Sequence, residues 1–244
     1  MIFGSSVSVV VPARNEGRHL VEVLDQLPNW VDEILVIDGN SSDNTLEIAK
    51  SYSRVNYSAR QRSNGKGAAL SAGFAKAKSD FVAIIDADGS MDPGELEKFM
   101  ELALTNDVVK GSRYLPGGGS TDLTFVRSFG NRLLTKLANI LFSQNWTDMA
   151  YGFAVFRREI LEDLALINYD AQGSIFSHKA YGQGFEIETL MFTRAARRHL
   201  KIAEIPSFES ERISGSSNLR AIRDGFRVLI CLFIERSRSN PRES

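Results

Sequence analysis

Short apolar runs alternate with amphipathic segments through the first half of the chain. The runs are rich in Val and Ile, which is typical of strands, and the expected strands are 7–11, 33–37, 81–85 and 108–109, with a weaker one near Val55. Between them, apolar spacing of three and four residues predicts helices at 18–27, 44–52, 67–77 and 94–104. Strand, helix, strand at this spacing indicates right-handed βαβ units. We therefore expect an α/β protein with a mostly parallel central sheet and helices on both faces.

The pattern changes after residue 113. A glycine-rich loop at 116–119 precedes a long amphipathic helix at 125–142. The remaining elements expected are a strand at 153–156, a helix from Arg158, an irregular segment at 168–184, a helix at 185–199, a strand at 202–205 and a final helix at 219–235. No internal repeat, low-complexity tract or linker interrupts the chain. The simplest organisation is one domain over residues 1–244.

Composition and charge exclude several classes of protein. The formal net charge is −1, which predicts no bulk attraction to nucleic acid. A single cysteine, Cys231, excludes an intramolecular disulfide and a cysteine-based zinc site, and it suits a reducing compartment. No apolar run reaches the roughly 18 residues of a membrane span, and the N-terminal residues do not have the pattern of a signal peptide. We expect a cytoplasmic location.

Polar residues follow three of the expected strands. The first strand leads into PARNE (12–16), the second into DGNSSDNT (38–45), and the third into DADGS (86–90). Ligands of open parallel sheets bind beyond the carboxyl ends of the strands. Asp38 and Asp86 each come directly after an apolar strand. This repetition predicts a shared cleft at that edge.

Asp86 and Asp88 are separated only by Ala87. Two carboxylates this close repel one another unless a cation or a set of donors offsets their charge. Mg²⁺ and Mn²⁺ prefer oxygen ligands, and such sites commonly use one or two carboxylates together with substrate phosphates. The pair therefore favours a divalent metal site, with a purely structural pair as the alternative.

The segment SNGKGAAL (63–70) is rich in glycine and contains Lys66. It lacks the glycine spacing, and the Ser or Thr after the lysine, of a nucleotide-binding phosphate loop. We interpret it as a turn whose amide groups and Lys66 approach a ligand.

The motifs together resemble a known family. VVVPARNE, VIDGNSSDNT, NGKGAAL, IIDADGS, KGSRYLPGG, TDMAYGFAVFRRE, FEIETLMFTRA and ERISGSSNL occur in the order seen in family-two glycosyltransferases, and the chain is most similar to the dolichyl- and polyprenyl-phosphate sugar transferases. The resemblance extends from Val7 to about Leu229. It implies the GT-A fold, a Rossmann-like sheet that holds a nucleotide-sugar together with Mg²⁺ or Mn²⁺.

The resemblance also implies roles for individual residues. The residues expected to line the nucleoside pocket are Pro12, Arg14, Glu16 and Asp38, with Lys66 also at the donor. Asp86, Ala87 and Asp88 match the DxD motif at the diphosphate, where Asp86 and Asp88 would hold the metal and Ser90 occupies the position of a third metal contact. Arg113 and Arg212 match arginines around the phosphates, and Arg127 matches one that meets the acceptor phosphate. The implied catalytic groups are Asp86, Asp88, Arg113 and Arg212.

Three positions depart from the family pattern. Arg14 replaces a tyrosine, Ser90 replaces a frequent glutamine, and Asn218 replaces a lysine of the RxxGxSKL stretch. The change at Arg14 affects the expected base contacts, the change at Ser90 affects the third metal contact, and the change at Asn218 removes one positive charge. The identity of the donor therefore does not follow from the resemblance.

The implied reaction is metal-dependent and inverts the anomeric carbon. A hexose, with mannose or glucose favoured, would pass from a GDP- or UDP-sugar to a polyprenyl or dolichyl phosphate. Residues 1–112 would form the nucleotide-sugar-binding half, 113–218 the acceptor-shaping half, and 219–244 a C-terminal amphipathic helix and tail. A hydroxyl acceptor is the main alternative, and it requires a general base, for which Glu186 and Glu188 are candidates.

Two further alternatives remain at this point. An aspartate-nucleophile phosphatase would also place D-x-D-G-[ST] after a strand, with Asp86 phosphorylated. It would need a later acidic pair, and the sequence offers only Glu204 and Glu209 near the last strand. The other alternative is a nucleotide-sugar-binding module without catalysis.

Two helices combine basic and apolar positions. Arg127, Arg132 and Lys136 share the helix 125–142 with Phe129, Leu133, Leu137 and Ile140. The final helix has an apolar run from Val228 to Ile234 between Arg227 and Arg236. The first pattern suits a phosphate carried on a lipid, and equally suits a core helix with a solvated basic face. The second suits a helix that lies on a membrane surface at the cytoplasmic face, and equally suits packing on the domain or on a second subunit of a homodimer.

Overall fold

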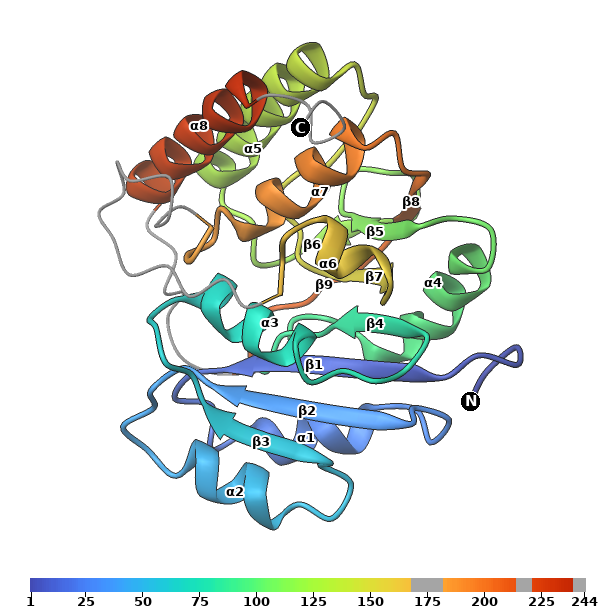
Figure 1. The fold of residues 1–244 in the computed structure, drawn as a ribbon. Helices are drawn as coiled ribbons and strands as arrows, with labels where there is room; N and C mark the ends of the chain where they lie inside the picture. The colour runs from blue at the N-terminus through green and yellow to red at the C-terminus, as the bar shows by residue number, and fades with distance from the viewer. Residues whose placement is uncertain (168–181, 214–220, 239–244) are drawn as a thin grey trace.

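The computed structural model describes residues 1–167, 182–213 and 221–238, and a seven-stranded sheet runs through its centre (Figure 1). The strands lie in the order β3-β2-β1-β4-β7-β5-β8, and β6 and β9 form a separate two-stranded sheet. The strands are β1 (Val7–Ala13), β2 (Glu33–Asp38), β3 (Tyr57–Arg60), β4 (Phe81–Ile84), β5 (Val108–Ser112), β6 (Gly119–Ser120), β7 (Ala154–Arg157), β8 (Ile202–Pro206) and β9 (Phe208–Glu209). The helices are α1 (Leu20–Gln26), α2 (Thr45–Ser51), α3 (Lys66–Phe74), the short 3-10 helix η1 (Pro93–Glu95), α4 (Leu96–Ala103), α5 (Phe125–Phe142), α6 (Ile160–Asp163), α7 (Ile187–Arg197) and α8 (Ala221–Ser237).

The central sheet is mostly parallel, as the sequence predicts. β3, β2, β1 and β4 pair in parallel, and β5 pairs in parallel with β8. β7 is the exception, because it runs antiparallel between β4 and β5. Strands from the first half and the second half of the chain therefore share one sheet.

Every strand of the central sheet except β3 contributes side chains to two separate cores, one on each face of the sheet. In β1, Val9 and Val11 pack in one core, whereas Val10 packs in the other. This follows from the two-residue period of a strand, and it explains why the predicted strands are apolar at nearly every position. Helices α1 and α4 cover the first core, and α3 and α7 cover the second.

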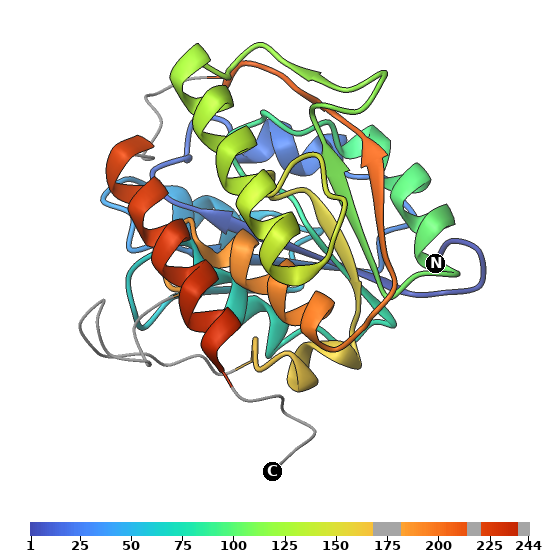
Figure 2. The ribbon, with the colours of Figure 1, turned by 90° about the horizontal axis from the view of Figure 1, so that it is seen from above.

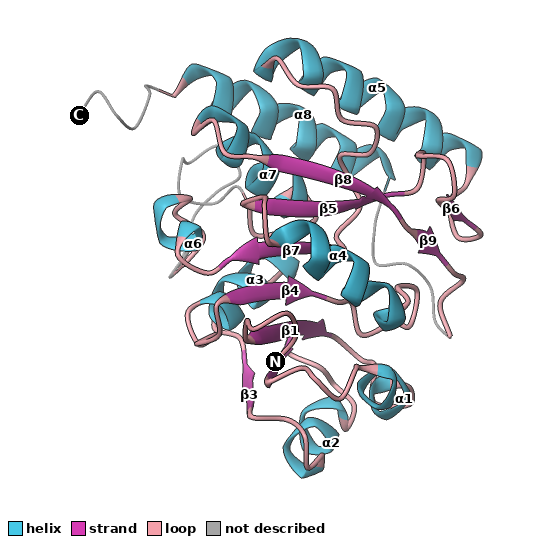
Figure 3. Cartoon of the chain, turned by 90° about the vertical axis from the view of Figure 1, so that its right-hand side faces the viewer, coloured by secondary structure: helices cyan, strands magenta, loops and turns pink. Residues whose placement is uncertain are grey.

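Helices α5 and α8 lie side by side at the end of the molecule where β5 and β8 are found (Figures 1 and 3). Seen from above, both helices run in the same general direction across α7 (Figure 2). Their inner sides pack on the core that α3 and α7 cover, through Ala138 of α5 and Val228, Cys231 and Leu232 of α8. Their outer sides are free of other described elements.

Several boundaries differ from the prediction. The strand expected near Val55 begins at Tyr57, while the long helix has the predicted bounds of 125 and 142. The strands β6 and β9 were not predicted, because two residues are too few to show a period. The predicted irregular segment at 168–184 and the start of the final helix lie mostly outside the described residues. Within those residues, no helix is both long and apolar enough to cross a bilayer.

Candidate active site

A pocket of about 380 Å³ opens at the carboxyl edge of the sheet, where β1 and β4 end. Parallel strands bring their carboxyl ends to one edge, so loops far apart in the sequence meet there. The sequence-predicted residues that line it are Pro12, Arg14, Glu16, Lys66, Asp86, Ala87, Asp88 and Arg212. The shared cleft expected from the strand ends is therefore present.

A tight turn places Asp86 and Asp88 at this pocket. After β4 the backbone turns at Gly89, which has a φ of +74°. A Cβ atom at Gly89 would lie 2.3 Å from Cδ1 of Ile213. Glycine is required here both for the positive φ and for the close approach of the segment that carries Arg212.

Arg212 is held against Asp88 by backbone pairing as well as by charge. The amide of Ile213 donates to the carbonyl of Asp88 at 3.1 Å, and the amide of Ser210 donates to that of Ser90 at 2.8 Å. Nη1 of Arg212 then lies 2.8 Å from Oδ2 of Asp88. The segment that follows β9 thus supplies a cation to the turn that carries Asp86 and Asp88.

Asp86 has one satisfied oxygen and one without a partner. Its Oδ2 accepts from Nζ of Lys66 at 2.7 Å, whereas its Oδ1 is buried and has no hydrogen-bond partner among the described residues. Burial raises the pKa of Asp86, and the neighbouring Asp88 carboxylate adds to the rise although Lys66 opposes it. A buried carboxylate oxygen without a partner is destabilising unless a cation or a hydrogen-bond donor binds it.

The arrangement fits a divalent cation held at Asp86 and Asp88. Among the described residues, no group of three or more His, Cys, Asp and Glu side chains gathers into a complete metal site. Mg²⁺ and Mn²⁺ sites that bind substrate phosphates commonly have only one or two protein carboxylates. The remaining ligands would come from a bound diphosphate.

Glu16 also lines the pocket, and its backbone is held by the start of α2. Its amide donates to Oγ1 of Thr45 at 2.9 Å. Burial raises the pKa of Glu16 to about 7, and the Asp88 carboxylate contributes. Glu16 is therefore a carboxyl group that titrates near neutral pH inside the pocket.

Asp38 and Ser90 support the pocket without lining it. Asp38 is fully buried, and it accepts from the Ser41 amide and, at 3.1 Å, from Nε of Arg60. Ser90 is buried, and its amide donates to Oδ1 of Asp88 at 3.1 Å. The contact seen for Ser90 thus orients Asp88, which differs from the direct metal contact expected from the sequence.

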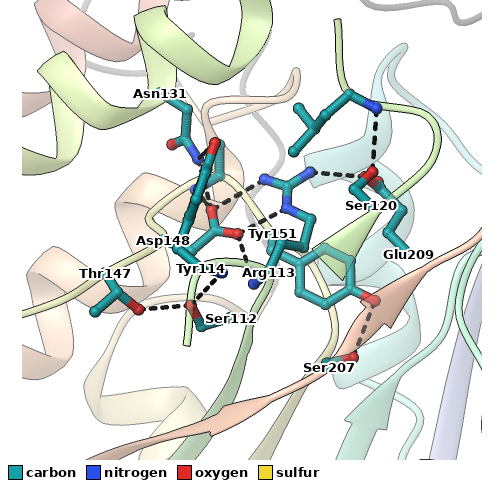
Figure 4. A network of polar contacts seen from close by, with 12 residues as sticks. Ser112, Arg113, Tyr114, Ser120, Asn131, Thr147, Asp148, Tyr151, Ser207 and Glu209 are labelled. Atoms are coloured by element: carbon teal, nitrogen blue, oxygen red, sulfur yellow. Dashed lines mark hydrogen bonds and ion pairs between the residues drawn. The ribbon is translucent and has the colours of Figure 1, made fainter. Parts of the chain in front are cut away.

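Arg113 is not among the residues that line the pocket. Its guanidinium instead pairs with Asp148 and Glu209 (Figure 4). Its Nε and Nη2 donate to the two carboxylate oxygens of Asp148 at 2.7 and 2.9 Å, and its Nη1 donates to Glu209 at 3.0 Å. All three side chains are buried. Although burial acts in the opposite direction, these carboxylates raise the pKa of Arg113 above its ordinary value. Two buried carboxylates therefore occupy the guanidinium in this structure, and the role of Arg113 at the phosphates stays a prediction.

Arg127 also lies outside the pocket, near the N-terminus of α5. Its Nη1 is 3.0 Å from Oδ2 of Asp122, and the same oxygen is 3.8 Å from Nε of Arg212. One carboxylate therefore separates Arg127 from the pocket. Asn218, the third departure from the family pattern, lies outside the described residues.

The structure adds pocket residues that the motifs did not indicate. They are Gly184 and Phe185, which precede α7, and Arg223 and Arg227 of α8. Arg227 makes two hydrogen bonds to Glu186, at 2.9 and 2.6 Å. The four-residue spacing of the two arginines, which puts them on one side of a helix, was the available signal.

The comparisons with known proteins agree with this geometry. The fold and the pocket define an α/β protein that binds its ligand at the carboxyl edge of a mostly parallel sheet. The family model described as "Glycosyl transferase family 2" matches residues 8–165, and the chain belongs to that family. It is therefore an enzyme, with the GT-A form of the Rossmann-like fold. The phosphatase hypothesis for Asp86 is wrong.

Three curated relatives cover most of the chain. It is 28% identical to glycosyltransferase AglJ of Haloferax volcanii over 97% of this chain and 74% of that protein. It is 29% identical to undecaprenyl-phosphate mannosyltransferase of Micrococcus luteus, over 87% of both chains. It is also 29% identical to dolichol-phosphate mannosyltransferase of Pyrococcus furiosus, over 88% of this chain but 59% of that protein.

Solved structures share the fold at lower sequence identity. Glucosyl-3-phosphoglycerate synthase from Mycobacterium tuberculosis, solved with Mn²⁺, UDP-glucose and phosphoglyceric acid, superposes with a TM-score of 0.71 and 21% identity. The match covers 98% of this chain and 82% of that one.

Proposed function

We propose that this enzyme transfers a hexose from a nucleoside-diphosphate sugar to a polyprenyl-type lipid phosphate, with inversion at the anomeric carbon. The names of the Micrococcus and Pyrococcus relatives support a lipid-phosphate acceptor, and mannose is the sugar that both names specify. The Mn²⁺ and UDP-glucose in the Mycobacterium structure support a nucleotide-sugar donor and a divalent metal.

One structural observation carries the choice of acceptor. A hydroxyl acceptor needs a general base, whereas a phosphate is already an anion near neutral pH. The two glutamates that the sequence offers as bases are both bound to cations inside the protein, Glu186 to Arg227 and Glu188 to Lys66. Neither lines the pocket. The transfer is therefore best suited to an acceptor that needs no base.

The pocket residues take up the donor's charges. Asp86 and Asp88 hold Mg²⁺ or Mn²⁺, with Ser90 orienting Asp88 through its amide. The bound metal ion stabilises the negative charge that develops on the departing diphosphate. Arg212 and Lys66 lie close enough to these aspartates to add positive charge on the same side. Pro12, Arg14 and Glu16 form the part of the pocket assigned to the nucleoside, with Asp38 beneath them.

Exposed apolar side chains on α5 and α8 suit a lipid. They are Phe125, Val126, Phe129, Leu133 and Ile140 of α5 and Phe226 and Phe233 of α8, and we call them the α5/α8 surface. Phe125 is 85% exposed and Phe226 64% exposed. Phe226 lies between the pocket-lining Arg223 and Arg227 in the sequence. Helix α8 thus carries both pocket-lining arginines and exposed apolar side chains.

The α5/α8 surface also suits binding to an anionic membrane. Arg132 and Lys136 of α5 and Arg236 of α8 are exposed beside it. Basic residues that flank an apolar helix face are typical of helices that lie on a lipid surface. We assign this surface to the membrane in which the acceptor lipid resides.

A second candidate function is transfer to a hydroxyl group, which Glu16 favours. A general base works best when its pKa is close to the working pH, and the pKa of Glu16 is about 7. In that case Glu16→Gln would lower kcat by about 10²- to 10⁴-fold, the usual contribution of a general base.

Acceptor and donor panels test both functions. The enzyme is incubated with Mn²⁺ or Mg²⁺, with labelled GDP-mannose, UDP-glucose and related donors, and with undecaprenyl phosphate or undecaprenol in detergent. We expect label in the lipid phase only with the phosphate, as a mild-acid-labile sugar phosphate. Label with the alcohol alone, lost in Glu16→Gln, would establish the second function instead.

A further inference from the structure

The ammonium group of Lys66 lies between two carboxylates, and one of them belongs to the proposed metal ligand Asp86. Nζ of Lys66 is 2.7 Å from Oδ2 of Asp86 and 2.9 Å from Oε1 of Glu188. Lys66 comes from the first turn of α3 and Glu188 from the first turn of α7. The Glu188 side chain is 4% exposed. Burial raises the pKa of Glu188 and Asp86 adds to the rise, whereas Lys66 lowers it.

Close backbone packing fixes this group in place. A Cβ atom on Gly152 would lie 2.8 Å from Nζ of Lys66 and 3.1 Å from Oε1 of Glu188. The amide of Gly67, the residue after Lys66, donates to the carbonyl of Gln183 at 2.8 Å. Backbone therefore packs directly against the ion pair at Gly152 and against the start of α3 at Gly67, which limits the room around the Lys66 side chain.

The charges of the three residues sum to −1 when all are ionised, and Oδ1 of Asp86 has no hydrogen-bond partner among the described residues. Lys66 and a metal ion would both be attracted to the Asp86 carboxylate. Glu188 competes for Lys66 from the other side, so the two carboxylates share its positive charge. How strongly Asp86 attracts a second cation then depends on Glu188, which does not line the pocket.

We propose that Glu188 is a positioning residue for the metal site. Because Glu188 also binds the Lys66 ammonium, that ammonium interacts less strongly with Asp86, and Glu188 thereby sets the affinity of Asp86 for Mg²⁺ or Mn²⁺. This inference rests on the proposed function, which places the metal at Asp86 and Asp88.

The proposal predicts that metal affinity follows local charge. Glu188→Gln removes one negative charge, so Lys66 pairs with the Asp86 carboxylate alone. We expect Mn²⁺ binding to weaken at least about tenfold, since charges a few ångströms apart interact strongly away from bulk water. Lys66→Gln removes the competing cation and should tighten Mn²⁺ binding by a similar factor. The double variant Lys66→Gln/Glu188→Gln restores the parent's net charge and should return the affinity toward that of the parent.

Direct Mn²⁺ binding tests this order without relying on turnover. Free Mn²⁺ is measured by electron paramagnetic resonance during titration of each purified protein with Mn²⁺ alone. Glu162→Gln, the same change at an exposed glutamate of α6, is the matched control and should bind like the parent. Circular dichroism confirms that each variant is folded, and Glu188→Gln with the charge-restored double variant suffices if Lys66→Gln does not fold.

The outcomes separate this inference from the function it rests on. If the parent binds Mn²⁺ and the Glu188 and Lys66 variants bind it equally well, or shift in the same direction, the positioning role of Glu188 is overturned while the metal site stands. If the parent binds no Mn²⁺, or if Asp88→Asn binds it as tightly as the parent does, the metal assignment itself is overturned.

Discussion

Arg212 and Asp88 form an ion pair of 2.8 Å in the pocket, although 123 residues lie between them in the sequence. The pair shows how the DxD turn is prepared for its ligand. One oxygen of Asp88 is oriented by the Ser90 amide and the other by Arg212. A carboxylate held in this way needs little rearrangement when a metal and a diphosphate enter.

Asp88→Asn should abolish most metal-dependent transfer while leaving the fold nearly intact. The amide keeps an oxygen for the Ser90 N–H but loses the charge that attracts a metal and pairs with Arg212. We expect kcat/KM to fall by about 10²-fold or more, the scale seen when one electrostatic stabiliser is removed. Asp92→Asn is the matched control, because Asp92 only caps η1 through the Gly94 amide. Equal transfer rates for Asp88→Asn and the parent would contradict the metal assignment.

Arg113 and Arg212 should have separable effects, although the sequence assigned both to the phosphates. Arg113→Met leaves Asp148 and Glu209 buried without their cation, and breaking such a pair costs about 3–5 kcal/mol of unfolding free energy. Arg212→Gln removes a charge that is partly exposed in the pocket and should mainly lower kcat/KM. Chemical denaturation and steady-state kinetics on both variants distinguish the two. A stable but inactive Arg113→Met would return Arg113 to the catalytic group.

The different fates of these arginines show what the sequence could predict. The strand ends and their carboxylates were predicted, because an apolar strand followed by Asp is a local pattern and parallel strands end at one edge. The identity of an arginine's partner is not local. Arg113 pairs with Asp148 and Glu209, which lie 35 and 96 residues further along the chain. No spacing rule in a single sequence connects residues that far apart.

The same limit explains the pocket wall formed by α8. Arg227 was interpreted only as the basic flank of an apolar helix and Arg223 was given no role, because nothing in the sequence placed α8 beside the strand ends. The structure shows that Arg227 reaches Glu186, which also accepts from the Gly182 and Gly184 amides. Tertiary packing thus converts a surface pattern into part of the pocket.

Protein stability should respond to pH through Glu16. Its folded-state pKa is about 7 and its ordinary value is 4.5, so the folded protein binds a proton that the unfolded chain releases between these values. Stability therefore falls as pH rises from about 4.5 to about 7 and stays lower above that. Glu16→Gln, which is neutral at every pH, should raise the melting temperature at pH 8 and change it little at pH 4.5. Melting is followed without metal or nucleotide, and an equal shift at both pH values would contradict the raised pKa.

Binding to anionic vesicles should depend on the apolar side chains of the α5/α8 surface. Phe129→Ser/Leu133→Ser removes two of them, at 63% and 60% exposure, so little packing is lost. We expect the parent to co-sediment with vesicles that contain phosphatidylglycerol and to bind less as salt is raised. It should bind at least about tenfold more tightly than this variant, because the two apolar side chains become buried in the vesicle on binding and contribute on that scale.

Val21→Ser/Leu104→Ser is the matched control, since these exposed apolar residues lie on α1 and directly after α4, away from the α5/α8 surface. It should bind vesicles like the parent. Transfer to a short, water-soluble prenyl phosphate should be similar for all three proteins, because the surface acts on the membrane and not on the chemistry in the pocket. If the parent ignores vesicles and the Phe129/Leu133 variant instead changes from dimer to monomer in sedimentation velocity, the surface is a contact between two copies of the chain, and the membrane assignment is wrong.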